Sequence, residues 1–180
     1  MTQLKTCDWV RHENCTSRTG NLCCFPIRDT IAPSRRPVTT MAIIALTVAI
    51  FVVEFVAHPQ HLGQIMYLFG IVPARYVHLD WALRVGFPVD SYFPFLTSIF
   101  LHSGLIHVAS NTWILWIFGD NVEDRMGRGR FAVFYIVCGI IAGLVHLWAN
   151  PHSTVPAVGA SGAIAGVLGA YLIPVSKGSN

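Results

Sequence analysis

Charged side chains are scarce in this sequence. Asp, Glu, Lys and Arg make up 12% of the 180 residues, while 53% are hydrophobic and the mean hydropathy is +0.55. Soluble domains carry about 25% charged residues, and disordered chains combine low hydrophobicity with high charge. The composition therefore excludes both classes and favours a membrane protein. The net charge of +3 is mild, and excess Lys and Arg in a membrane protein is first a topology signal, so we predict no nucleic-acid partner.

Cysteines are few and unevenly placed. Cys138 lies in an apolar stretch, and the other four lie in the first 24 residues: Cys7, Cys15, Cys23 and Cys24. An odd count does not predict a closed disulfide framework. These four with His12 offer ligands for zinc in principle, but without a C-x2-C pair we predict no metal site and no cofactor. The first 20 residues also lack the apolar core of a signal peptide.

Long apolar runs are present, and they predict an all-α membrane helix bundle. At about 20 apolar residues per crossing, we expect four spans, over residues 38–57, 95–118, 131–149 and 157–175. Residues 1–37 form a polar tail, and 176–180 a short C-terminal tail. Residues 58–95 are interrupted by Pro and Gly and rich in aromatics, which favours a loop lying in the membrane interface. We expect the second span to stop at Gly119 and residues 120–123 to form a capping box.

Basic residues set the predicted orientation. Seven lie beside the tail, the loop after the second span and the C-terminus, namely Arg28, Arg35, Arg36, Arg125, Arg128, Arg130 and Lys177. Only Arg75 and Arg84 lie on the opposite side. The positive-inside rule therefore places the N-terminus in the cytoplasm. Glu54 lies near the external end of the first span, where we expect it to be neutral or to reach the interface.

Three polar side chains begin the second span. His107 and Asn111 are four residues apart and so share a helix face, and His102 lies near the external end. Such groups are costly in a membrane unless they face protein or water. They are donors suited to a negative oxygen, but a hydrogen bond between helices is an equal interpretation. A small channel or transporter would also explain them.

The fourth span begins with Ser161 between small residues. Gly162, Gly166 and Ala170 are spaced by four residues, and so are Ser161, Ala165 and Gly169. This spacing is typical of a packing face, for which the hydroxyl would be incidental. However, the helix from residue 161 to 174 rises only about 20 Å, short of the roughly 30 Å of a crossing. Ser161 should thus lie below the external surface, at the depth of the histidines, as a nucleophile lies beside oxyanion donors.

With these segments the sequence resembles the rhomboid family of intramembrane serine proteases, of bacterial type. The resemblance covers roughly residues 25–173, and the segments that carry it are 27–29 (IRD), 69–75 (FGIVPAR), 96–102 (LTSIFLH) through 111, 118–127 (FGDNVEDRMG) and 159–171 (GASGAIAGVLGAY). It implies that Ser161 is the nucleophile, that His107 and Asn111 stabilise the oxyanion, and that His102 lies near the mouth of the site. It also implies transmembrane protein substrates, contact with membrane lipid and a bacterial inner membrane.

Two features depart from the family pattern. The usual Trp-Arg pair of the interfacial loop is absent. The family core has six spans with a catalytic His on the sixth, and no His in this sequence matches that base. We therefore expect a rhomboid-like protein truncated after the fourth helix, with four of the usual six spans and without its base. The alternative is a catalytically inactive rhomboid-like protein that binds transmembrane helices.

Overall fold

The computed structural model describes residues 36–57, 59–88 and 91–172. The cysteine-containing part of the tail, its His12 and the expected last residues of the fourth span lie outside these ranges. The described residues form helices and no named strand: α1 (Val38–Val56), α2 (Pro59–Phe69), α3 (Ala74–Val77), α4 (Leu79–Val85), α5 (Pro94–Thr97), α6 (Leu105–Met126), α7 (Arg128–Ala149) and α8 (Ser161–Leu172). The predicted all-α class is confirmed.

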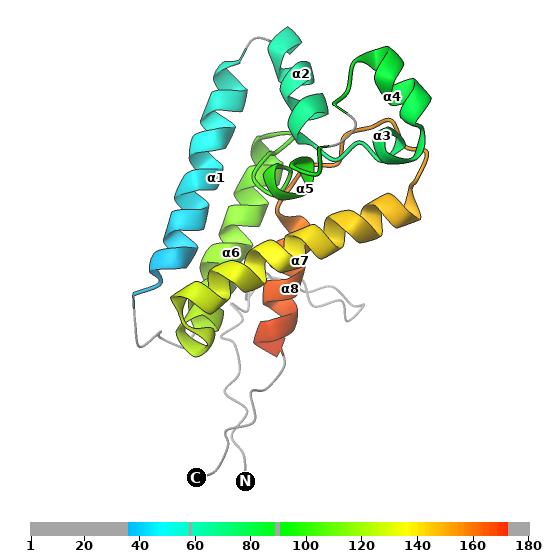
Figure 1. The fold of residues 1–180 in the computed structure, drawn as a ribbon. Helices are drawn as coiled ribbons and strands as arrows, with labels where there is room; N and C mark the ends of the chain where they lie inside the picture. Colours follow the sequence, from blue (N-terminus) through cyan, green and yellow to red (C-terminus); the bar gives the residue numbers. More distant parts are fainter. Residues whose placement is uncertain (1–35, 58, 89–90, 173–180) are drawn as a thin grey trace, which may run out of the picture.

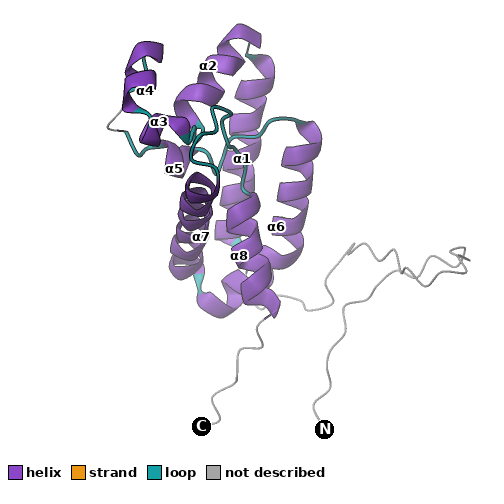
Figure 2. Ribbon diagram, turned by 90° about the vertical axis from the view of Figure 1, so that its right-hand side faces the viewer, coloured by secondary structure: helices purple, strands orange, loops and turns teal. Residues whose placement is uncertain are grey.

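Four helices build the bundle, and the short ones gather at one of its ends. Helix α8 packs against α6 and α7, and α1 packs against α6. Helices α2 to α5 lie at the end where α1 finishes and α6 begins (Figure 1). The view turned by 90° shows α1, α6, α7 and α8 side by side, with α3 and α4 projecting beyond them (Figure 2).

Two of the described helices are long and apolar enough to cross a membrane, namely Val38–Val56 and Arg128–Ala149. Most of their side chains are not covered by the protein, because only 22% of each apolar window is buried. Valines and aromatics such as Val52 and Phe55 of α1, and Val137 and Trp148 of α7, are exposed. An apolar helix with an uncovered apolar surface is suited to contact with lipid chains.

The helix expected from residue 95 to 118 differs at both ends. Helix α5 stops at Thr97, the chain is irregular from 98 to 104, and α6 continues to Met126. Gly119 does not end α6. It is buried where α6 meets α1, and a Cβ there would lie 3.0 Å from Thr40 Cγ2. The helix ends at Gly127, whose φ of +83° is a conformation that glycine adopts without strain.

Glu123 does not belong to a capping box of its own helix. Its carboxylate accepts hydrogen bonds from the N–H groups of Thr39 (2.9 Å) and Thr40 (2.7 Å) and from the Thr40 hydroxyl (2.8 Å). It therefore caps the N-terminus of α1 from another helix, where N–H groups lack partners within their own helix. Glu123 lies past the apolar part of α6. Burial raises its pKa, but these hydrogen bonds lower it further, to below the ordinary value.

Candidate active site

Ser161 is the first residue of α8, and the segment before it sets where this helix begins along the bundle. The chain from Asn150 to Ala160 runs from the end of α7 back toward the middle of the bundle before α8 begins (Figure 1). Helix α8 has 12 residues, about 18 Å at 1.5 Å per residue. The depth of the serine in a membrane stays a prediction.

Backbone hydrogen bonds hold this segment in place. Ile71 and Ala157 form an isolated antiparallel bridge, in which each N–H donates to the other's carbonyl at 3.0 and 2.8 Å. The Ala74 N–H donates to the Ser153 carbonyl at 2.9 Å, and the Gly159 N–H donates to the Ser98 carbonyl at 2.8 Å. The segment 69–75, noted in the sequence for its resemblance alone, is thus the support of the chain that leads to Ser161.

Arg75 anchors the long segment between α1 and α6, from which the family's Trp-Arg pair is absent. Its side chain is fully buried, and its guanidinium donates to the Pro88 carbonyl. The guanidinium carbon lies 5.4 Å from the centre of the Phe87 ring, within the range of a cation–π interaction. One arginine therefore ties the segment 69–75 to the far side of the loop.

His107 lies against the turn that precedes Ser161. A Cβ on Gly159 would lie 2.7 Å from Cε1 and 2.8 Å from Nε2 of the His107 ring. Gly159 also has a φ of +127°, which L side chains rarely adopt. Glycine has no Cβ and adopts this backbone conformation readily. The His107 imidazole can therefore contact the backbone at position 159, two residues before the serine. The ring is held on its other side by the Ser103 hydroxyl, 3.2 Å from Nδ1.

Asn111 and His102, unlike His107, have hydrogen-bond and ring partners outside the turn that precedes Ser161. The Asn111 amide donates one of its two N–H groups to the His107 carbonyl in its own helix at 2.9 Å, so this N–H is not free for a substrate in the present conformation. His102 is 1% exposed, and its ring lies edge-on to that of His107, with 5.0 Å between the centres. Its backbone N–H donates to Glu54 at 3.2 Å.

Glu54 is buried within the protein. Its side chain therefore does not extend to the surface, which was one of the two alternatives expected for it. It is 3% exposed, and its Oε1 lacks a hydrogen-bond partner among the described residues, as does His102 Nε2. The carboxyl group holds the irregular chain before α6 by accepting the His102 N–H. Glu54 thereby supports the position from which His102 and His107 extend.

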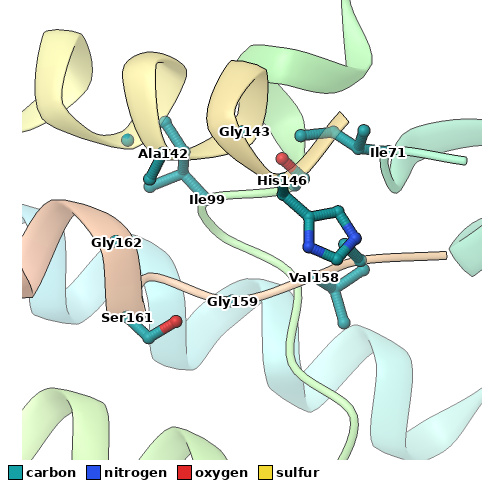
Figure 3. Close-up of a pocket in the computed structure, with 12 residues that line it drawn as sticks. Ile71, Ile99, Ala142, Gly143, His146, Val158, Gly159, Ser161 and Gly162 are labelled. Atoms are coloured by element: carbon teal, nitrogen blue, oxygen red, sulfur yellow. The ribbon is translucent and has the colours of Figure 1, made fainter. Parts of the chain in front are cut away.

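A cavity of about 220 Å³ opens beside Ser161, and His146 lies on its opposite side. Figure 3 shows the Ser161 side chain below α7 and the His146 ring close to Val158. Ser98 also lines this cavity, whereas His107 and Asn111 are not among its described lining residues. Sequence reasoning missed His146 because it matches no family position. The short connection from the end of α7 to the start of α8 was the signal that could have drawn attention to it, because it keeps His146 and Ser161 near each other along the chain.

The two small-residue faces of α8 have different surroundings. A Cβ on Gly162 would lie 2.2 Å from Ala142 Cβ, and one on Gly166 would lie 2.5 Å from Cys138 Sγ. This face is therefore packed against α7 and is not an unpartnered surface. The other face is open, because Ser161 and Ala165 are exposed and nothing lies within 4 Å of a Cβ on Gly169.

Comparison with known proteins adds an independent observation. Residues 89–179 match the family model of the Rhomboid domain. The chain is 46% identical over 77 residues to "Rhomboid protease GluP" of Bacillus subtilis (strain 168), covering 43% of this chain and 15% of that protein. It is 33% identical over 119 residues to YdcA of the same strain, provisionally named a rhomboid protease, covering 63% and 59%.

A third relative is a mitochondrial protein of an animal. The chain is 33% identical over 87 residues to "Presenilin-associated rhomboid-like protein, mitochondrial" of Mus musculus, covering 47% of this chain and 23% of that protein. The chain thus spans less than two thirds of the length of each of these relatives. No solved structure matches it. The family model covers half of the chain, and the chain belongs to the rhomboid family.

Proposed function

We propose that Ser161 is the nucleophile of an intramembrane serine endopeptidase that cleaves transmembrane protein substrates. The observation that carries the proposal is the contact of the His107 ring with Gly159, two residues before a serine that opens a helix. The first N–H groups of a helix have no partner within it. Donors of the backbone and of an imidazole therefore lie near one exposed hydroxyl, as an acyl-transfer site requires.

In the reaction, Ser161 Oγ would add to the carbonyl carbon of the scissile peptide bond and lose its proton to a general base. The N–H of Ser161 and the His107 side chain would hold the negative oxygen of the tetrahedral intermediate. Asn111 would join them through the second N–H of its side-chain amide. The C–N bond then breaks, the amine leaves with a proton, and water hydrolyses the acyl-enzyme. A serine and a base need no metal for these steps.

The general base is the unassigned part of this site. None of the eight histidines occupies a position that matches the family's base. His146 is the imidazole that lines the same cavity as Ser161, whereas in the family the base comes from another helix. Replacing His146 by alanine separates the two sources, because activity survives only if the base comes from elsewhere.

The test is cleavage of a transmembrane substrate in proteoliposomes by the wild-type chain, Ser161→Ala and Ser153→Ala. Ser153 lies outside the cavity, and its hydroxyl accepts the Val155 N–H, so this variant is the matched control. Where the wild-type chain cleaves the substrate, we expect the control to cleave it equally and Ser161→Ala not to cleave it. Equal cleavage by Ser161→Ala would refute the assignment of the nucleophile.

A second function rests on the open face of α8. If the wild-type chain cleaves nothing, we propose that it is a non-catalytic rhomboid-like protein that binds a transmembrane helix along Ser161, Ala165 and Gly169. Small residues at this spacing allow close approach of a helix backbone. A cysteine at position 169 should then form crosslinks with a bound helix, and one at the packed position 166 should not.

We further propose a bacterial inner membrane as the location, with the N-terminus in the cytoplasm. The distribution of basic residues supports this orientation. Labelling of single cysteines introduced at positions 128 and 152 of a chain otherwise free of cysteine tests it. Only the second should react with a membrane-impermeant reagent in intact cells.

A further inference from the structure

Two histidines far apart in the sequence meet at the external end of the bundle, outside the candidate active site. Nε2 of His78, which follows α3, lies 2.7 Å from Nδ1 of His152, which precedes the turn to α8. Their rings are stacked, with 5.0 Å between the centres and 29° between the planes. Both side chains are exposed. We propose that this pair binds a divalent transition metal ion that prefers imidazole nitrogen in square-planar geometry, of which Cu²⁺ is the strongest binder.

The spacing of the two nitrogens carries the proposal. Two nitrogens in adjacent positions of a square-planar ion, each about 2.0 Å from the metal, lie about 2.8 Å apart, whereas tetrahedral zinc holds its ligands about 3.3 Å apart. The observed 2.7 Å is close to the first value. The two rings now share a hydrogen bond, and the metal ion would replace it after each exposed ring turns until its nitrogen lone pair points at the metal.

The backbone on both sides of the pair is already fixed. The Ala74 N–H donates to the Ser153 carbonyl, and the His78 N–H donates to the Ala74 carbonyl. One hydrogen bond therefore joins the two segments next to His152, and one within residues 74–78 fixes the backbone of His78. Binding would order little beyond two side chains. Preorganisation of this kind favours affinity because less conformational entropy is lost.

The other ligands would be water. Among the described residues, no group of three His, Cys, Asp or Glu is placed to hold a metal ion. The pair instead borders a surface hollow of about 580 Å³, with the Asp80 carboxylate on its edge. The hollow gives room for two water ligands, and a nearby carboxylate is an acceptor for a hydrogen bond from one of them.

The experiment is a Cu²⁺ titration of the purified chain, carrying a tag without histidine, followed by electron paramagnetic resonance. His78→Gln and His152→Gln remove one nitrogen each and retain a hydrogen-bonding side chain. His146→Gln is the control, since it removes a neighbouring imidazole outside the pair. We expect one equivalent with splitting from two nitrogens in the wild type and the control. Both pair variants should lose this signal and bind at least ten-fold more weakly.

A second measurement tests the link between the two segments. Cu²⁺ should raise the midpoint of thermal unfolding of the wild type and of His146→Gln, because a ligand that binds only the folded state stabilises it. It should leave the midpoints of His78→Gln and His152→Gln unchanged. An unaltered two-nitrogen signal in either pair variant, or the absence of that signal in the wild type, would overturn the proposal.

Discussion

Replacing Gly162 by alanine should push α8 away from α7. The Cβ of the new residue would lie 2.2 Å from Ala142 Cβ, whereas ordinary contact begins at 3.4 Å. The two helices must therefore separate locally by about 1 Å or more, since neither atom is the end of a flexible side chain. Overpacking of this kind costs about 1–3 kcal/mol. Part of this cost is offset by the higher helix propensity of alanine, about 1 kcal/mol, so we expect a net loss of up to about 2 kcal/mol.

Gly169→Ala is the matched control in the same helix. Nothing lies within 4 Å of a Cβ at this position, so only the gain in helix propensity remains. We expect this variant to unfold like the wild type or to be more stable by up to about 1 kcal/mol. The two substitutions are chemically identical, and the expected difference between them reports the contact between α7 and α8.

The assay is equilibrium unfolding in mixed micelles of increasing SDS content, followed by the fluorescence of the five tryptophans. Ala142→Gly combined with Gly162→Ala removes the opposing methyl group and should restore much of the lost stability, with a coupling energy of about 1 kcal/mol or more. Close packing of α8 on α7 at Gly162 would be refuted if Gly162→Ala and Gly169→Ala unfolded alike, or if the double variant showed no coupling.

Three further predictions concern single polar or backbone positions. Glu123→Gln should lower the free energy of unfolding by about 1–2 kcal/mol at neutral pH, because it weakens the cap of α1. Folding lowers the pKa of Glu123, so the wild type should lose the same contribution as the pH falls through that lowered pKa. The free energy of unfolding of the Gln variant should therefore depend less on pH. Gly159→Ala should abolish substrate cleavage by displacing an imidazole, while Gly63→Ala, with nothing near its Cβ, should not. Glu54→Leu should cost about 1–3 kcal/mol in SDS unfolding because the buried His102 N–H loses its acceptor, and Glu54→Gln should cost less.

The helix class was predictable from the sequence because apolar runs of helix length have few alternatives in a membrane. The ends of α6 were not. Gly119 has the composition of a helix stop, but it lies where α6 packs closely on Thr40, and a glycine serves close packing as well as termination. Only the partner helix decides between the two roles, and the partner is 79 residues away in the sequence.

The candidate site was predictable in its residue types and less so in its contacts. The common depth of His107 and Ser161 follows from counting residues along two helices. The packing of Gly162 and Gly166 on α7 depends on the rotation of α8 about its axis. The sequence does not determine this rotation, because two faces of the helix carry small residues at the same spacing. The same rotation decides that Ser161 faces the cavity shared with His146.

A nucleophile below the membrane surface, as proposed for Ser161, would create a backbone problem that the segment 69–75 and Ser98 resolve. The chain from Asn150 to Ala160 must descend without helical hydrogen bonds, and unpaired N–H and C=O groups are costly away from water. Ile71, Ala74 and Ser98 supply partners for that descending chain. The segment 69–75 is therefore part of the support of the candidate site, and Ile71 of this segment lines the same cavity as Ser161. This explains why a long loop with a buried arginine precedes a helix that carries the polar residues.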